Sequence, residues 1–559
     1  MFSPSKLAAI WATLALALVS AALGRTLKWT SCPGLDEPYA CSSLVVPLDH
    51  LDPGFETISI GLIRYRPSIS NGSMGSILIN PGGPGGSGVE VVKVAGSILA
   101  TITGGGYDIV GFDPRGIGES QSVLCNPSVD AHTTFDAIEL ELALNIPGIN
   151  PAWASFQKTK ALACGRYSSG YLPFLSTAYV ARDMDLIREA LGESVLNFFG
   201  FSYGTFLGLT YINMFPDRVG RVVIDGVVNP DMYTATPIDM WSGSLVDILP
   251  EFEEFGRQCQ QAGPTGCALS RPEGSGRDVT ARIRSLINEL DADPISFVDS
   301  GIPTVISGRF VGQIVFQVMY STTAWPALAA ALQDIIESRN ATAIARMSGI
   351  TSEKQLCQTK DVSGNNGFPS VFCLDGHGSD KLSLQHWIDA DIDMNSKYSF
   401  LGTGLLLRSL SCKYWPVKAA ERYTGPWDRK LKNKVLIIGS TYDPVTPLAS
   451  ARHVEKLMRG NGVLLHHDGA GHTSLGQFSL CTMGKLWSYF YFGILPERGT
   501  KCPITVPAFP PPDAPSMLVQ SEEMLSQLDQ AWAGQLKLED IEVLQTQIAL
   551  VNTKHLLGH

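Results

Sequence analysis

Charged residues are scarce in this 559-residue sequence, and most of them are acidic. Asp, Glu, Lys and Arg make up 17% of it, below the roughly 25% of a typical soluble domain. Hydrophobic residues make up 45%, so the chain is neither disordered nor a coiled coil. Because 42 basic residues face 53 acidic ones, the net charge of −11 argues against a nucleic-acid partner.

Metal motifs, internal repeats and later membrane spans are also missing. Neither C-x-x-C nor H-E-x-x-H occurs, so we expect no metal and no cofactor. After residue 23 no apolar run is long enough to cross a membrane, which predicts that the mature chain does not contact one. The sequence gives no indication of an oligomeric state.

The amino-terminal segment predicts export. An apolar run, Leu7–Leu23, follows Lys6 and ends among small residues, so residues 1–24 are interpreted as a signal peptide and the protein as secreted. A retained signal anchor is the alternative. Asn71 and Asn340 begin glycosylation sequons in polar surroundings.

Export makes the eleven cysteines candidates for disulfides. Eleven is an odd number, so one thiol is left over, and Cys412 is the candidate. Neighbours in the sequence suggest the pairs Cys32/Cys41, Cys125/Cys164, Cys259/Cys267, Cys357/Cys373 and Cys481/Cys502.

Eight short β-branched runs bounded by turn residues predict strands. The first two predict an antiparallel edge hairpin, and the later ones alternate with helical patterns such as 88–102 and 203–215. This order predicts an α/β fold with an eight-stranded, mostly parallel sheet. The eight runs are 43–49, 57–66, 76–80, 107–113, 195–200, 221–225, 434–439 and 462–467.

A long helical segment interrupts this series between the sixth and seventh strands. From 230 to 432 the pattern predicts helices alone, which we interpret as an inserted lid domain. The predicted core therefore has two parts, 25–229 and 433–507. Residues 508–559 form a proline-rich linker and a helical tail.

The most specific motif is Gly200-Phe-Ser-Tyr-Gly204. It lies between a predicted strand and a predicted helix, which is where G-x-S-x-G forms a nucleophile elbow that lifts the serine above the sheet. Ser202 is therefore the candidate nucleophile.

A serine nucleophile needs a base and a carboxylate to orient that base. In hydrolases built this way they follow in the order Asp, His, at the ends of later strands. Asp443 and His472 occupy these places, 29 residues apart. His466 and His467, nearer the strand, are weaker candidates for the base, and Asp468 is a weaker candidate for the orienting carboxylate.

A glycine-rich segment, Asn80–Gly88, follows the third strand. Backbone without side chains can approach a substrate carbonyl, so the N–H groups of Gly83 and Tyr203 are candidates for an oxyanion hole. The segment also satisfies G-x-G-x-x-G, the dinucleotide fingerprint, with Asp108 as the ribose-binding acid. That alternative requires Asp108 to end a strand, whereas it begins one.

Six motifs together resemble the secreted tripeptidyl-aminopeptidase group of the prolyl-iminopeptidase-like α/β-hydrolases. The segment 434–502 resembles the TAP-like C-terminal region of that group. Pro81 and Phe201 depart from prolyl iminopeptidases proper, which have His and a small residue there. The motifs are 80–88, 111–120, 200–205, 225–230, 442–447 and 469–474.

The resemblance implies the α/β-hydrolase fold and a serine exopeptidase that cleaves short peptides from free amino termini through an acyl-enzyme. Such enzymes bind the substrate ammonium with acidic lid residues, yet Glu251, Glu253 and Glu254 are interpreted as a solvated helix face. Two alternatives stay open: hydrolysis of a small ester, lactone or amide, and a binding protein on a decayed hydrolase scaffold.

Overall fold

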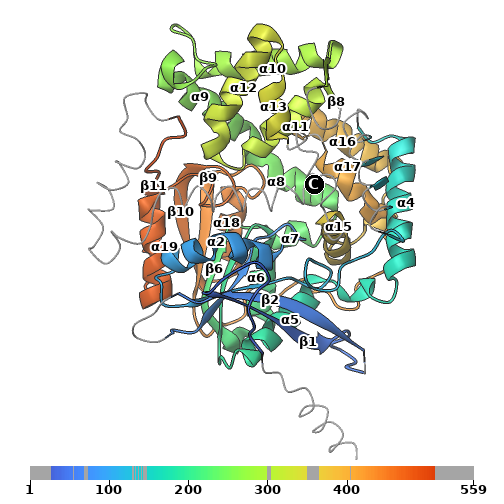
Figure 1. Cartoon of the computed structure of the whole chain (residues 1–559), viewed down its shortest axis with the longest axis vertical. Coiled ribbons are helices and arrows are strands. Elements are labelled where there is room, and N and C mark those ends of the chain that lie inside the picture. The colour runs from blue at the N-terminus through green and yellow to red at the C-terminus, as the bar shows by residue number, and fades with distance from the viewer. Residues whose placement is uncertain are drawn as a thin grey trace, which may run out of the picture.

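A mixed sheet of nine strands forms the centre of the molecule (Figure 1). The computed structural model describes residues 27–509, except 55, 68–72, several positions within 129–147, 299–303, 349–363 and 403. In sheet order the strands are β1 (Tyr39–Pro47), β2 (Thr57–Tyr65), β4 (Asp108–Phe112), β3 (Ser76–Asn80), β5 (Leu196–Phe201), β6 (Val219–Asp225), β9 (Val435–Tyr442), β10 (Gly462–Ala470) and β11 (Lys501–Pro503).

The sheet is parallel from β4 to β11, and only β1 and β2 run antiparallel to their neighbours. The predicted edge hairpin and the mostly parallel sheet are therefore confirmed. The ninth strand, β11, was not predicted, because three residues with one buried side chain, Cys502, are too few to show an alternating pattern.

Helices cover both faces of the sheet and create two hydrophobic cores. Alternate strand residues point to opposite faces: Leu78 and Val110 pack in one core, while Ile77 and Ile109 pack in the other. The first core lies under α5 (Thr177–Ala190), α6 (Tyr203–Met214) and α18 (Leu448–Leu457), and the second under α2 (Gly88–Ile102) and α19 (Leu480–Phe492).

The insertion between β6 and β9 is largely helical and lies over one end of the sheet (Figure 1). Its elements are α7 (Pro230–Tyr233), α8 (Pro237–Ser244), α9 (Ile248–Gly266), α10 (Gly276–Ala292), α11 (Gly308–Val318), α12 (Trp325–Ser338), α13 (Thr342–Met347), α15 (Gly364–Asp375), α16 (Leu384–Tyr398) and α17 (Leu405–Ser409). The prediction of helices alone is wrong in one place, because β7 (Ile295–Phe297) and β8 (Thr304–Ile306) form a small antiparallel hairpin.

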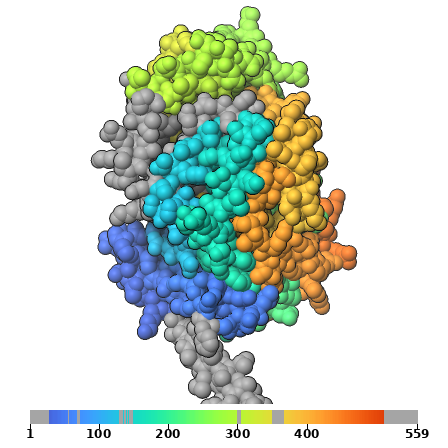
Figure 2. All heavy atoms as spheres, turned by 90° about the vertical axis from the view of Figure 1, so that its right-hand side faces the viewer, coloured from blue at the N-terminus to red at the C-terminus, as the bar shows by residue number. Residues whose placement is uncertain are grey.

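One helix from the first part of the chain packs against the insertion. The indole N–H of Trp153, in α4 (Pro151–Ser168), donates to the Leu407 carbonyl oxygen at 2.8 Å. The N–H of Ile149 donates to the Asp391 carboxylate at 3.0 Å. Figure 2 shows the surface of this helix beside that of the later insertion residues. No helix of the described part of the chain is long and apolar enough to cross a membrane.

Five disulfides join ten of the cysteines. Four predicted pairs are confirmed: Cys32–Cys41, Cys125–Cys164, Cys259–Cys267 and Cys481–Cys502.

The fifth predicted pair is wrong, because Cys373 bonds to Cys412. Packing of α15 against the segment after α17 brings these two cysteines together, which proximity in the sequence could not show. Cys357, Asn71, the predicted signal peptide and the tail beyond 509 lie outside the described residues, whereas Asn340 is exposed beyond the end of α12.

We expect Cys412→Ser to lower the free energy of unfolding by about 2–4 kcal/mol, because the disulfide closes a loop across 39 positions. Thermal unfolding of the variant and of the wild type measures the effect. Non-reducing peptide mapping should recover a peptide linking Cys373 to Cys412, and a Cys357–Cys373 peptide in its place would contradict this pairing.

Candidate active site

Ser202 lies in a sharp turn between β5 and α6. Its backbone has φ 56° and ψ −125°, a positive-φ conformation that non-glycine residues rarely adopt. The Ser202 N–H donates to the Asp225 carbonyl oxygen at 3.0 Å, which ties this turn to the end of β6. Backbone strain of this kind is characteristic of functional sites.

Close backbone approach explains the two glycines of the motif. A Cβ atom on Gly200 would lie 2.4 Å from the Gly204 carbonyl oxygen. A Cβ on Gly204 would lie 2.6 Å from the carbonyl oxygen of Asn80, at the end of β3. Neither contact is sterically possible, so only glycine lets the turn close against the neighbouring strand.

Asp443 and His472 form a buried pair at the ends of β9 and β10. The Nδ1 atom of His472 lies 3.0 Å from Asp443 Oδ1, and both side chains are almost fully buried. Asp443 also accepts N–H donors from Val445 at 3.1 Å, Thr446 at 2.8 Å and Thr473 at 2.8 Å.

Asp443 stays ionised at neutral pH despite this burial. Burial alone would raise the pKa of Asp443, but the adjacent His472 and the N–H donors of Thr473 and Thr446 hold that pKa below its usual value. Since a carboxylate only accepts, His472 Nδ1 must carry the proton, and Nε2 is left free to accept one.

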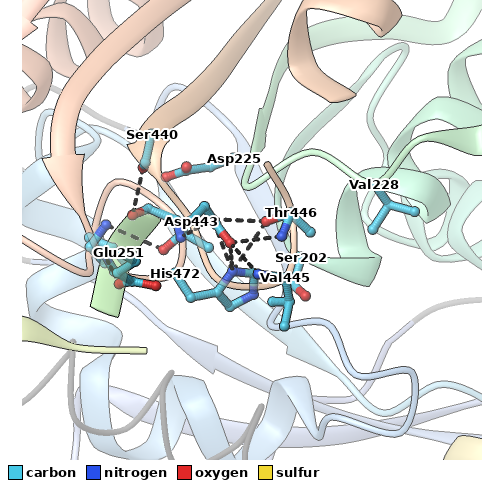
Figure 3. Close-up of polar contacts among 12 residues, drawn as sticks. Ser202, Asp225, Val228, Glu251, Ser440, Asp443, Val445, Thr446 and His472 are labelled. Atoms are coloured by element: carbon cyan, nitrogen blue, oxygen red, sulfur yellow. Dashed lines mark hydrogen bonds and ion pairs between the residues drawn. The ribbon is translucent and has the colours of Figure 1, made fainter. Parts of the chain in front are cut away.

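Ser202 lies beside the His472 ring, opposite Asp443 (Figure 3). Among the described residues, the buried Nε2 atom of His472 has no hydrogen-bond partner. The predicted nucleophile, base and orienting carboxylate therefore lie together at the carboxyl ends of the parallel strands β5, β9 and β10.

Ser202 opens onto a pocket that also contains the two predicted oxyanion residues. Gly83 and Tyr203 both line it, and the pocket has about 440 Å³ of empty space, open solvent included. Tyr203 is the first residue of α6, so no helix carbonyl accepts its N–H. The rest of the wall is mainly apolar, with Tyr233, Met240, Trp241, Phe368 and Phe372.

The weaker candidates for the base are engaged elsewhere. His466 Nε2 lies 2.8 Å from Thr441 Oγ1, and His467 Nδ1 lies 2.9 Å from Thr482 Oγ1. Burial lowers the pKa of His467 to about 4, so this ring is neutral at physiological pH. Asp468 accepts from Thr441 and pairs with Lys501, away from His472.

The dinucleotide alternative fails on geometry. The glycine-rich segment follows the carboxyl end of β3, whereas Asp108 begins β4, which is parallel to β3 and pairs there with Ser76. Arg66 binds the Asp108 carboxylate at 2.9 Å at that far end. Groups of three or more metal-ligating side chains do not occur among the residues that the structure describes.

Two acidic residues that were not predicted as site residues contact the loop of His472. Asp225 accepts the N–H of Ser474 at 2.9 Å and lies 2.6 Å from its hydroxyl oxygen. Glu251 accepts the N–H of Gly471 at 2.8 Å and is fully buried. The interpretation of Glu251 as solvated is therefore wrong, although Glu253 and Glu254 are partly exposed and pair with arginines.

Two family models match the chain: "alpha/beta hydrolase fold" over residues 75–255 and "TAP-like protein" over residues 398–502. The chain is 26% identical to Serine protease Hip1 of Mycobacterium tuberculosis over 86% of this chain and 91% of that protein. It is 26% identical to Tripeptidyl aminopeptidase of Streptomyces lividans, covering 85% and 86%, and 27% identical to Carboxylesterase B of Mycobacterium tuberculosis, covering 83% and 86%.

The nine-stranded sheet, its helical layers and the first family match identify an enzyme of the α/β-hydrolase fold. Within that class the chain is a serine hydrolase with a TAP-like C-terminal region, as the six motifs suggested. The TAP-like match contains both Asp443 and His472, and the other match contains Ser202.

Burial raises the pKa of Asp225 to about 7, even though its hydrogen bonds with Ser474 lower it. The folded state therefore binds this proton more tightly than the unfolded state, whose carboxyl has a pKa of about 3.9. The resulting stabilisation is complete below pH ~4 and is lost as the pH rises towards 7.

We therefore expect Asp225→Asn, which does not titrate, to gain stability relative to the wild type between pH 4 and 7. The gain should be on the order of a few kcal/mol. Chemical denaturation of both proteins at several pH values measures it. A stability difference that does not change with pH would contradict the raised pKa.

Proposed function

We propose that the protein is a secreted serine exopeptidase that releases short peptides from free amino termini through an acyl-enzyme. The observation that carries the proposal is the buried Asp443–His472 pair, whose free Nε2 atom faces Ser202. The similarity to a named serine protease and a named tripeptidyl aminopeptidase supports a peptide substrate. The predicted signal peptide, the five disulfides and the exposed Asn340 sequon support export.

In the proposed first half-reaction, Ser202 Oγ attacks the substrate carbonyl carbon while His472 Nε2 takes its proton. The N–H groups of Gly83 and Tyr203 donate to the oxyanion that forms. Asp443 stabilises the imidazolium, which then gives its proton to the leaving amine. The acyl group remains on Ser202 as an ester.

Water completes the cycle by attacking that ester. His472 accepts a proton from the water and returns one to Ser202 Oγ as the carboxylic acid product leaves. The apolar pocket wall accommodates uncharged substrate groups next to the reacting carbonyl.

We expect Ser202→Ala and His472→Ala each to reduce kcat/KM by about 10⁵- to 10⁶-fold, because nucleophile and base act as one unit. Asp443→Asn should cost about 10⁴-fold, since an amide favours the wrong histidine tautomer. Release of p-nitroaniline from Ala-Ala-Pro-p-nitroanilide measures the effect. His453 is a partly exposed histidine that pairs with Asp231. The variant His453→Ala is therefore the control and should keep full activity.

An exopeptidase must recognise the free ammonium group, so acetylating that tripeptide substrate should reduce kcat/KM by about 100-fold or more. Paired assays of the free and acetylated substrates measure the ratio. Equal cleavage of both would contradict action at the amino terminus while leaving the serine mechanism in place.

Hydrolysis of a small ester, lactone or amide is the second candidate. Two observations favour it: the similarity to a named carboxylesterase, and the absence of charged side chains among the described residues that line the pocket. Hydrolysis of p-nitrophenyl esters without cleavage of any peptide amide would select this function.

A further inference from the structure

The His472 loop, residues 471–476, is compact, and each of its backbone N–H groups donates a hydrogen bond. Gly471 and Gly476 touch, since a Cβ on Gly471 would lie 2.7 Å from the Gly476 Cα. Thr473 has a φ of 65°, which a residue with a β-branched side chain adopts only where its surroundings impose it. A loop with this conformation depends on outside partners.

Two of those partners, Asp443 and Asp225, lie at the ends of strands of the sheet. The Thr473 N–H donates to Asp443 at 2.8 Å, and the Ser474 N–H donates to Asp225 at 2.9 Å. Both carboxyl groups lie at strand ends, so they anchor the middle of the loop to the sheet.

Three further partners, Glu251, Tyr320 and Thr322, belong to the inserted segment. The Gly471 N–H donates to Glu251 Oε1, on α9, at 2.8 Å. The His472 N–H donates to the Tyr320 carbonyl oxygen, just beyond α11, at 2.9 Å, and the two rings meet edge to face at 5.0 Å. The N–H and hydroxyl of Thr322 both donate to the Gly476 carbonyl oxygen at 2.9 Å.

Glu251 makes this contact from a fully buried position. Its other oxygen, Oε2, has no hydrogen-bond partner among the described residues. Burial raises the pKa of Glu251 well above its usual value, and the nearby charge of Asp443 raises it further. A carboxyl that holds its proton accepts through one oxygen much as a glutamine side chain does.

We propose that the inserted helices hold the base in place, with Glu251 and Thr322 as positioning residues for His472. This inference rests on the proposed function, in which His472 is the base. Without these contacts the loop relaxes, and the base is displaced from Ser202 by a fraction of an ångström to an ångström, which is enough to slow catalysis. Through these two residues the insertion positions the base as well as covering the pocket.

The test compares substitutions at Glu251 in the full-length protein, with p-nitrophenyl butyrate as the substrate. Glu251→Ala should lower kcat about 10- to 100-fold with KM changed less than about threefold. Glu251→Gln should keep kcat within about threefold, because the amide oxygen replaces Oε1 as the acceptor. Glu253→Ala, on the partly exposed side of α9, is the matched control and should leave kcat unchanged.

A second pair covers the case in which Glu251→Ala does not fold. Thr322→Val should lower kcat about 3- to 10-fold by removing the hydroxyl, whereas Thr322→Ser should retain activity. Equal kcat for the two Thr322 variants overturns the proposal. So does a Glu251→Ala variant with a lower Tm but wild-type kcat per folded molecule, or a Glu251→Gln variant as slow as Glu251→Ala.

The ester assay separates this proposal from the proposed function. If Ser202→Ala hydrolyses the ester as fast as the wild type does, the proposed function fails. If Ser202→Ala is inactive while Glu251→Ala has wild-type kcat, only the positioning role fails.

Discussion

The hydrogen bond between Asp443 and His472 is the interaction on which the rest of the site depends. A buried carboxylate is costly unless its oxygens are occupied, and here three backbone N–H groups and one imidazole N–H occupy them. Those donors come from the two strand-end loops that have to meet. The same contacts that stabilise the charge therefore also fix the position of His472.

The three carboxyl groups around the His472 loop, those of Asp443, Asp225 and Glu251, differ in the direction in which their pKa values are shifted. Only Asp443 has a lowered pKa, whereas burial raises the pKa of Asp225 and of Glu251. Three negative charges in one buried volume would repel strongly, which favours the protonated forms of Asp225 and Glu251 over three ionised carboxylates. Asp225 also joins the two halves of the site, because its carbonyl oxygen binds Ser202 N–H while its carboxyl binds Ser474.

Local signals predicted most of the core and the residues with the strongest motifs. The helix at 88–102 has the predicted bounds because Ser87 caps it and its apolar face is continuous. That Ser202, Asp443 and His472 lie at the same end of the sheet could be predicted because each follows a strand, and parallel strands bring their carboxyl ends together.

Contacts between distant segments could not be predicted in this way. Cys373 bonds to Cys412 because of how two segments of the insertion pack, which is a tertiary effect. Glu251 did carry a signal, since it lies on the same helical stripe as Ile248, Phe252 and Phe255, all of them buried. The helical periodicity alone predicts a buried Glu251, whereas the charge of its side chain predicts an exposed one.

The central claim is that Ser202 is the nucleophile activated by His472. The most direct measurement is to treat the protein with a fluorophosphonate and locate the modified residue by mass spectrometry. Our account predicts a single adduct on Ser202 that forms much more slowly when His472 is replaced by Ala. An adduct on another residue, or labelling of Ser202 at the same rate without His472, would contradict it.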